Sequence, residues 1–413
     1  MSTATGVSEN WSMTSVVRRL LTPRGLDDPY AIYREIRAAA DAGARTGRFL
    51  FRYDAVREAL YDRELSSDRI SAVLRPLPED VRAETELLES TLRDIVVFRD
   101  HPSHRRLRRL LTSAFTPRMV QQARPMIERF TAGLLDGLAD DGVFDLHRGL
   151  TYPLPALVVA ALLGIPEADR DAFQAWALDI VLIVGSGSIT PGLARRANDS
   201  MRQMRELMSR LVRERRRDPG PDLLSAMIAA SAEGERVTAD ELYANALFLM
   251  TAGHETATNL LSNAIITLLR HPDQLALLAQ DMSLLDSAIE EVLRFEGPVQ
   301  IAARIADRDR EVQGVTLKAG QPLIVMLGAA NRDPDVFSDP DRFDIRRPPS
   351  QHVAFAHGMH FCLGAALART EMQVVLPQVL ARFPELRLAS DEISWQPTLD
   401  FRGPNELLVR SGS

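Results

Sequence analysis

A single long helical pattern limits what this chain can fold into. Thr238 and Glu241 have the spacing of a capping box just before a periodic run of apolar residues, and the run stops at His271 and Pro272. The pattern predicts a helix of roughly 30 residues, about 45 Å long at ~1.5 Å per residue. Such a helix crosses a whole domain, so the other elements must pack around it.

The middle of this helix is polar for a segment that crosses a core. Residues 251–258 read TAGHETAT. Gly253 costs about 1 kcal/mol relative to alanine, and an unpaired Glu255 is costly to bury. Such groups can simply face solvent or bond to their own helix. At mid-span they instead favour a ligand site, where Gly253 admits a flat ligand and Glu255 beside Thr256 passes protons.

The remainder of the chain predicts a mainly α fold with a small β part, an α+β class. Strand patterns occur near residue 50 and between Glu311 and Leu327. No repeat or linker marks a domain boundary, so we expect an N-terminal arm of residues 1–20 and a single domain of residues 21–413. Helical periodicity recurs in residues 29–39, 107–115, 124–138, 156–164 and 194–216.

The composition excludes several classes of protein. With a net charge of -7, the chain lacks the basic excess that nucleic-acid binding usually needs. Its single cysteine forms no intrachain disulfide, and no window offers the ~18 apolar residues of a membrane span. The first twenty residues lack the apolar core of a signal peptide. We therefore expect a cytoplasmic monomer that binds neither nucleic acid nor membrane.

The only cysteine lies in the stretch FAHGMHFCLG, residues 355–364. It could be a buried inert thiol, a zinc ligand together with His357 and His360, or a ligand to another group. The pattern CLGAALARTEM places Cys362 at a helix N-terminus, where free N–H groups favour a thiolate. Zinc explains neither the glycines nor the long helix, and for a cysteine taken alone a buried inert thiol is the favoured interpretation.

Four motifs follow one another in a fixed order: AGHET in the long helix, Glu291 and Arg294 as ExxR, the segment NRDPDVFSDPDRFDIRR, and the cysteine stretch. Together they resemble the cytochrome P450 family, in particular its soluble bacterial haem-thiolate monooxygenases, from about Asp28 almost to the C-terminus. The resemblance implies the cytochrome P450 fold, with haem b between the long helix and the cysteine-loop helix. It also implies that Cys362 is the axial ligand of the haem iron, which favours O–O cleavage.

The resemblance assigns roles to further residues. Glu255 and Thr256 correspond to an acid–alcohol pair that supplies protons during O2 activation, so alanine at Thr256 is expected to uncouple electron use from product formation. Glu291 and Arg294 correspond to a structural pair, which Arg342 is expected to join. The expected haem contacts are His104, Arg108, Ala252, Arg304, Phe355, Gly358, His360 and Gly364.

The resemblance also predicts the substrate and the partners. A bulky hydrophobic small molecule, hydroxylated or epoxidised in secondary-metabolite biosynthesis, is expected in a pocket with residues 67–96 and 175–192 in its wall and a mobile lid at 185–188. Electrons would come from a ferredoxin or a similar protein that docks on the arginines at 105, 106, 108 and 109. A carrier-tethered substrate, oxidative coupling and a non-catalytic haem-binding or docking domain remain alternatives. The expected pocket residues are Phe248, Ala252, Gly253, Val299 and Ile301.

Two residues depart from the family pattern. Ala356 stands where the family usually has glycine after the phenylalanine. Pro377 interrupts the helix that follows the cysteine, and a proline inside a helix costs about 3 kcal/mol unless the helix kinks or ends. We therefore expect a kink or break near Val374.

Overall fold

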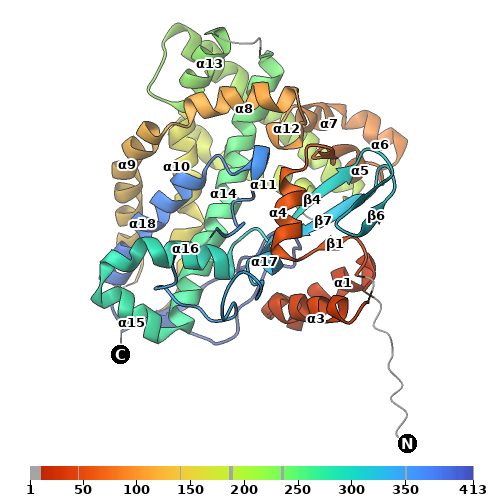
Figure 1. Cartoon of the computed structure of the whole chain (residues 1–413). Coiled ribbons are helices and arrows are strands. Elements are labelled where there is room, and N and C mark those ends of the chain that lie inside the picture. Colours follow the sequence, from red (N-terminus) through yellow and green to blue (C-terminus); the bar gives the residue numbers. More distant parts are fainter. Residues whose placement is uncertain are drawn as a thin grey trace, which may run out of the picture.

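A computed structural model describes residues 11–44, 46–139, 141–185, 189–233, 237–348 and 351–412. The long helix α14 (Ala239–Arg270) runs through the centre, as Figure 1 shows, and helices surround it. A smaller β part lies to one side, with α1 and α3 below it in the view. The mainly α architecture with a small β part is therefore confirmed.

The other helices divide into those before and those after α14 in the chain. Those before α14 are α1 (Met13–Leu20), α2 (Pro23–Asp27), α3 (Pro29–Asp41), α4 (Tyr53–Tyr61), α5 (Ile70–Leu74), α6 (Glu79–Glu84), α7 (Glu86–Arg93), α8 (Ser103–Ala114), α9 (Pro117–Asp136), α10 (Pro153–Leu163), α11 (Glu167–Gly185), α12 (Pro191–Arg217) and α13 (Leu223–Glu233). Those after it are α15 (Pro272–Gln280), α16 (Leu285–Glu296), α17 (Leu327–Ala330) and α18 (Ala365–Arg382). Four short turns are η1 (Val96–Phe98), η2 (His147–Thr151), η3 (Met282–Leu284) and η4 (Gly358–His360). All five predicted helical segments fall on these helices to within two residues.

The ends of α14 are those predicted from the sequence. Glu241 donates its backbone N–H to Thr238 Oγ1 at 3.1 Å, and Thr238 donates its own N–H to Glu241 Oε2 at 2.9 Å. The side chain of Glu241 also pairs with Arg106 of α8. The Arg106 guanidinium and the capping bonds hold the pKa of Glu241 below its usual value. The capping box therefore fixes the start of α14 and also joins it to α8.

The apolar packing along α14 is interrupted at the polar segment singled out in the sequence. One buried cluster includes Leu247 and Met250, and a second includes Leu260 and Ile265. Residues 251–258 belong to neither cluster. The centre of the longest helix therefore borders something other than tightly packed core.

Three small sheets make up the β part. The largest has the strand order β1 (Phe49–Leu50), β7 (Pro322–Met326), β4 (Ile301–Ala306) and β2 (Leu65–Ser66). The second has the order β3 (Gly142–Asp145), β9 (Leu408–Ser411) and β8 (Arg387–Leu388), and the third pairs β5 (Arg310–Val312) with β6 (Val315–Leu317). Just before β4, Val299 lies opposite Phe401 as an isolated bridge. Both predicted strand regions are therefore confirmed.

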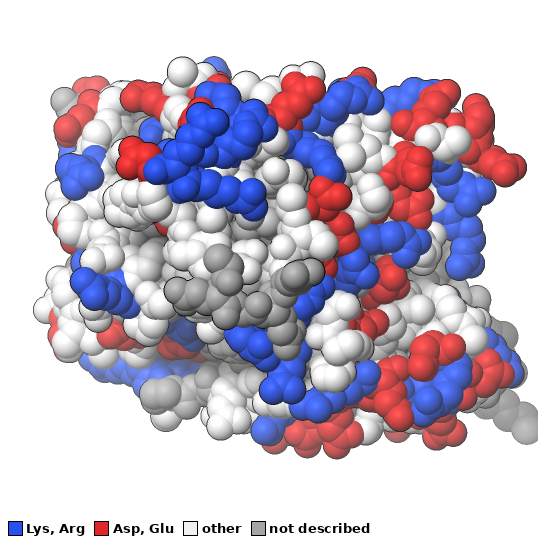
Figure 2. Space-filling model, turned by 90° about the horizontal axis from the view of Figure 1, so that it is seen from above, with Lys and Arg blue, Asp and Glu red and all other residues white. Residues whose placement is uncertain are grey.

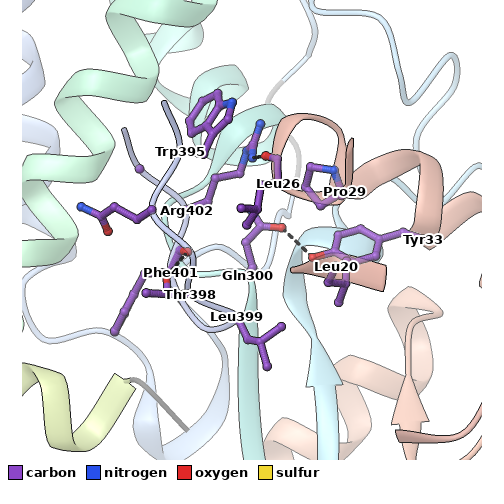
Figure 3. Close-up of a pocket in the computed structure, with 13 residues that line it drawn as sticks. Leu20, Leu26, Pro29, Tyr33, Gln300, Trp395, Thr398, Leu399, Phe401 and Arg402 are labelled. Atoms are coloured by element: carbon purple, nitrogen blue, oxygen red, sulfur yellow. Dashed lines mark hydrogen bonds between the residues drawn. The ribbon is translucent and has the colours of Figure 1, made fainter. Parts of the chain in front are cut away.

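Residues 11–20, part of the expected N-terminal arm, are packed against the rest of the chain. Trp11, Val16 and Leu20 are buried in one cluster with Tyr33 of α3 and Met326 of β7. A small cavity of about 30 Å³ lies between this region and the C-terminal segment (Figure 3). Residues 1–10 lie outside the described residues, and the described part of the segment belongs to the packed domain.

The C-terminal segment is joined to the N-terminal region by hydrogen bonds. Figure 3 shows the hydroxyl of Tyr33 directed at Gln300, to whose Oε1 it donates at 3.1 Å. Arg402 stacks over the ring of Trp395 at 3.7 Å and donates to the carbonyls of Leu26 and Asp27. These contacts hold the N-terminal region and the C-terminal segment together beside Gln300, the residue just before β4.

The helix that follows the cysteine does not break. Helix α18 is continuous from Ala365 to Arg382 with Pro377 inside it, so a break near Val374 is excluded, and a kink there stays a prediction. Val374, Val375 and Leu376 are buried against α9 and the surrounding core, and this packing offsets the unfavourable proline. Residues 186–188 of the expected lid lie outside the described residues.

No single helix in the described part of the chain is long and apolar enough to cross a membrane. One bent pair, His147–Leu163 with Glu167–Ile180, meets the criteria of length and composition only when both halves are counted together.

Candidate active site

A cavity of about 320 Å³ lies between the centre of α14 and the cysteine segment. Its walls also include η1, α8 and the residues just before β4. Segments distant in sequence, including three of the four motifs, therefore meet around one space. The residues predicted from the sequence that line it are His104, Arg108, Phe248, Ala252, Gly253, Thr256, Val299, Phe355, His360, Cys362 and Gly364.

Cys362 lies at the start of α18, and its sulfur faces this cavity. Its backbone N–H donates to the Phe355 carbonyl at 3.0 Å, which closes the loop. Burial raises the pKa of the thiol, whereas the N–H groups of Gly364 and Ala365 and the nearby Arg108 act to lower it. The helix start therefore offers hydrogen-bond donors to an anionic sulfur, as the sequence predicted.

The zinc interpretation is wrong. His360 Nε2 lies 2.9 Å from Ser67 Oγ, and its ring is 4.4 Å from that of His104. His357 instead stacks on Tyr61, with ring centroids 5.8 Å apart. Turn η4 directs the two imidazoles to different neighbours, and the described residues contain no group of three side chains that could hold a metal ion.

Basic side chains gather at one edge of the cavity, where His104, Arg108 and His360 line it, whereas Arg304, a predicted haem contact, lies close to them but does not line it. Burial and neighbouring cations lower the pKa of His104 to about 4, of His360 to about 3 and of Arg304 to about 10. Arg108 lines the same cavity, and burial lowers its pKa as well. Arg69, which we did not predict, also contributes its charge to this group. With these pKa values the two imidazoles are neutral N–H donors near pH 7, whereas the arginines stay charged, and the two carboxylates of a haem would satisfy both kinds of group.

The central pair on α14 splits between two directions. Thr256 lines the cavity and donates its hydroxyl to the Ala252 carbonyl at 2.7 Å. Glu255 does not line the cavity, and its Oε1 accepts a hydrogen bond from Asn259 Nδ2 at 3.1 Å. The alcohol therefore faces the space in which a ligand would lie, and the acid stands one residue away with an amide partner.

Two of the three glycines predicted to contact a ligand, Gly253 and Gly358, have packing roles. A Cβ at Gly253 would lie 2.8 Å from Val159 Cγ2 of α10, so the glycine lets α10 cross α14 closely while it lines the cavity. Gly358 has φ +71°, and a Cβ there would lie 2.8 Å from the carbonyl oxygen of Leu60. It does not line the cavity and serves the approach of α4. Ala356 adopts φ +55°, a region that favours glycine and is consistent with the family pattern.

The structural pair is formed as expected, but its third member is a different arginine. Arg294 donates from Nε and Nη2 to Glu291, both at 2.8 Å, with the two side chains almost fully buried. Arg347 Nε donates to Glu291 at 3.1 Å. The side chain of Arg342 is 66% exposed, and only its carbonyl accepts from Arg294. The prediction of Arg342 is wrong because the turn at 339–347 directs Arg347 inward.

The predicted pocket wall needs two further corrections. Ile301 is not among the lining residues; it is buried and lies opposite Met326 in the β4–β7 pairing. Neighbouring Val299 and Ala302 line the cavity instead. Within residues 175–192, no described residue lines it.

Sequence reasoning missed one acidic residue of this wall. Glu371 of α18 is 2% exposed and lines the cavity. Burial raises the pKa of its carboxyl to about 8. Its place nine residues after Cys362 belongs to none of the motifs on which we relied, although a glutamate on an otherwise apolar helix face is itself a signal.

The family model for cytochrome P450 matches residues 49–394. The chain belongs to the cytochrome P450 family. It is 40% identical over 395 residues to the cytochrome P450 monooxygenase PikC of Streptomyces venezuelae. The aligned region covers 93% of this chain and 91% of PikC. It is 35% identical over 386 residues to the biotin biosynthesis cytochrome P450 of Bacillus subtilis. Here the aligned region covers 93% of this chain and 96% of that relative.

Solved cytochrome P450 structures resemble the structure of this chain over almost its whole length. The structure of P450BioI in complex with an acyl carrier protein ligated to hexadec-9Z-enoic acid has a TM-score of 0.83 and 34% identity, with 93% of this chain and 98% of that chain covered. The fold predicted from the sequence is confirmed. As a family member, the protein is a monooxygenase whose cofactor is haem b.

Proposed function

We propose that this cytochrome P450 inserts one oxygen atom of O2 into a bulky, largely hydrophobic small molecule, with electrons from a ferredoxin or similar protein, in secondary-metabolite biosynthesis. The observation that supports the proposal best is one cavity with the sulfur of Cys362 on one wall and the hydroxyl of Thr256 on another. Most of the remaining lining residues are apolar, including Phe248, Leu249 and Val299. An apolar pocket with few polar groups suits a hydrophobic substrate.

In this proposal Cys362 would hold the haem iron through its sulfur, and the bound haem would supply the oxygen-activating chemistry. His104, Arg108 and His360 would hold the haem carboxylates, and the charges of Arg304 and Arg69, which lie close to His360, would support them. The apolar wall excludes water from the space beside Thr256. The fit rests on the donor set, because a thiol at a helix start and buried cations at one edge match a thiolate-ligated dicarboxylic haem.

Thr256 and Glu255 would manage the protons of the reaction. Thr256 Oγ1 gives its own proton to the Ala252 carbonyl, so its lone pairs remain available to accept a hydrogen bond from a donor in the cavity. Asn259 holds Glu255 by one carboxylate oxygen and leaves the other to exchange protons. The alcohol then orients the donor and the acid replaces the proton that is consumed.

The docking surface for the electron donor is smaller than the sequence suggested. Arg105 and Arg109 of α8 are exposed, whereas Arg106 pairs with Glu241 and Arg108 lines the cavity. Figure 2 shows the molecule from above, that is, from the top of Figure 1, where α8 and α13 lie. Basic side chains gather in patches among acidic ones on this face. The exposed arginines of α8 suit an acidic electron donor through electrostatic steering.

A substrate carried by a carrier protein is the second candidate. It is favoured by the similarity to P450BioI, whose structure contains a ligated acyl carrier protein. Titration of the protein with free fatty acid and with the same acid on a carrier protein separates the two candidates. A change in the haem spectrum with both forms supports a free substrate, and a change with the carrier-bound form alone supports the tethered one.

An absorption spectrum tests the assignment of Cys362. The purified protein, reduced and exposed to carbon monoxide, should show the strongly red-shifted band of a thiolate-ligated haem. Cys362→Ser should lose this band because a hydroxyl is a poor substitute for a thiolate. A colourless wild-type protein, or a band that survives in the variant, would contradict the proposal.

A further inference from the structure

The polar residues of α14 continue past the pair that the proposed function uses. They occur at three- and four-residue spacing, which places them along one side of the helix. Apart from Glu255 they are at most 1% exposed, so they do not face solvent. We call this set the polar stripe; its members are Glu255, Thr258, Asn259, Ser262 and Asn263.

Three oxygens of the polar stripe have no partner among the described residues. Thr258 Oγ1, Asn259 Oδ1 and Asn263 Oδ1 are buried and form no hydrogen bond with protein atoms. The amide nitrogens of both asparagines are bonded, to Glu255 Oε1 for Asn259 and to the carbonyls of Glu296 and Arg402 for Asn263. Buried polar oxygens in proteins are almost always hydrogen-bonded, and ordered water is the usual partner where protein supplies none.

The far end of the stripe leads into a cluster of hydroxyls and an imidazole. Thr151 Oγ1 lies 2.6 Å from Ser262 Oγ, and His147 Nδ1 lies 3.2 Å from Ser262 Oγ and 3.3 Å from Thr151 Oγ1. Burial lowers the pKa of His147, whereas the charges of Asp145 and Glu255 act to raise it. The imidazole therefore lies within electrostatic reach of the acid at the other end.

Helix geometry brings the two ends together. Thr258 stands three residues after Glu255 and four before Ser262, so each step spans about one helical turn. A water bonded to Thr258 Oγ1 would lie between the acid and the hydroxyl cluster. Gly403 lies against Asn259, since a Cβ there would lie 1.9 Å from Asn259 Oδ1. Because Gly403 has no Cβ, the Asn259 side chain has room to stay at Glu255, to which it donates.

We propose that the polar stripe is a hydrated proton path that leads from His147 to Glu255. This inference rests on the proposed function, because the path replaces the protons that Glu255 gives up. Each water or hydroxyl accepts one proton on a lone pair and releases another to its neighbour. One proton enters at the imidazole, one arrives at the carboxylate, and no charge remains on the groups between them.

A structure of the haem-loaded protein tests the hydration directly. We expect ordered waters within hydrogen-bonding distance of Thr258 Oγ1 and Asn259 Oδ1. The water at Thr258 Oγ1 should be lost in Thr258→Val. This result does not depend on turnover, so it is informative even if the proposed reaction is wrong. Dry, well-ordered density around both oxygens would overturn the proposal.

Kinetics then test the transport of protons. We expect Thr258→Val and Ser262→Ala to slow NADH consumption several-fold, with a ferredoxin, its reductase and O2, and to increase the solvent isotope effect in D2O. Thr131→Val is the matched control, because Thr131 is fully buried but donates to its own helix at the Ile127 carbonyl. It should behave as the wild type.

Two outcomes separate the path from the proposed function. Variants that keep the thiolate spectrum and consume NADH with an unchanged rate and isotope effect would overturn the path alone. Loss of the thiolate spectrum in the wild type would contradict the proposed function, while the water sites could still be observed. Equal slowing in Thr131→Val would show a general packing effect and would also overturn the path.

Discussion

At the scale of single residues, Glu371 links the cavity to pH. Its carboxyl is almost fully buried, and burial raises its pKa from 4.5 to about 8. In the unfolded chain the group ionises near its ordinary value, so the native state binds the proton more tightly. The contribution of Glu371 to stability is therefore full below about pH 4.5, and it is lost as the pH rises toward 8.

The prediction is a loss of stability between pH 5 and about 8 that Glu371→Gln largely removes, since a neutral amide has no proton to lose. Each unit of the shift corresponds to about 1.4 kcal/mol, so the effect is on the order of a few kcal/mol. Denaturant unfolding of the haem-loaded protein at several pH values measures it. Glu385→Gln, at an exposed position after α18, is the control. Parallel pH profiles for the wild type and Glu371→Gln would refute the assignment.

Sequence reasoning at this scale was successful where a residue type has a chemical requirement at a fixed spacing. Cys362 at a helix start and Thr256 at mid-helix both line the cavity as expected. Arg69 could not be predicted, because a lone arginine in a segment without a motif gives no sign of where its side chain points. Ile301 was misplaced because strand alternation is read only once the start of the strand is known.

At the scale of elements, Glu291 of α16 holds the segment before the cysteine through Arg347. Arg347 also donates to the carbonyls of Ser338, Asp339 and Arg342. Its removal leaves these acceptors and one side of Glu291 without their partner, while Arg294 still pairs with Glu291. We expect Arg347→Leu to destabilise the protein by about 1–3 kcal/mol, the cost of leaving its hydrogen-bond acceptors unsatisfied. Arg342→Leu should change the stability by less than about 0.5 kcal/mol, because that side chain is exposed.

Denaturant unfolding of the two leucine variants makes this comparison, with the carbon monoxide spectrum as a second readout. We expect Arg347→Leu to lose haem or the thiolate band at lower denaturant concentration than the wild type. Similar stability of the two variants would contradict the role of Arg347. The comparison is matched, because both substitutions remove an arginine from the same turn.

The elements also show where local preferences are overruled. The start of α14 could be predicted from Thr238 and Glu241, the two residues of the capping box, and the helix begins there in the structure. The continuity of α18 through Pro377 does not follow from the sequence, because the packing of its buried valines outweighs the preference of one residue. Local signals therefore predicted the ends of helices better than interruptions within them.

At the scale of the whole molecule, the placement of charge matters more than its sum. The chain has a net charge of -7, which would repel an acidic electron donor, yet α8 presents Arg105 and Arg109 to solvent. These side chains stand on the helix whose His104 and Arg108 line the cavity. Electrons that enter at this surface would have a short distance to travel, and like charges elsewhere would disfavour other docking positions.

Salt and charge removal should therefore slow reduction of the haem at this surface. We expect the rate of reduction by an acidic ferredoxin to fall as ionic strength rises, because the Debye length shortens to about 8 Å at 0.15 M. Arg105→Gln should lower the rate at low salt and weaken its dependence on salt. Stopped-flow mixing under carbon monoxide measures the rate. Arg270→Gln is the control, since this exposed arginine at the far end of α14 is roughly 44 Å along the helix from Glu241, which pairs with α8. An equal effect of both substitutions would indicate that the total charge, and not α8, governs the encounter.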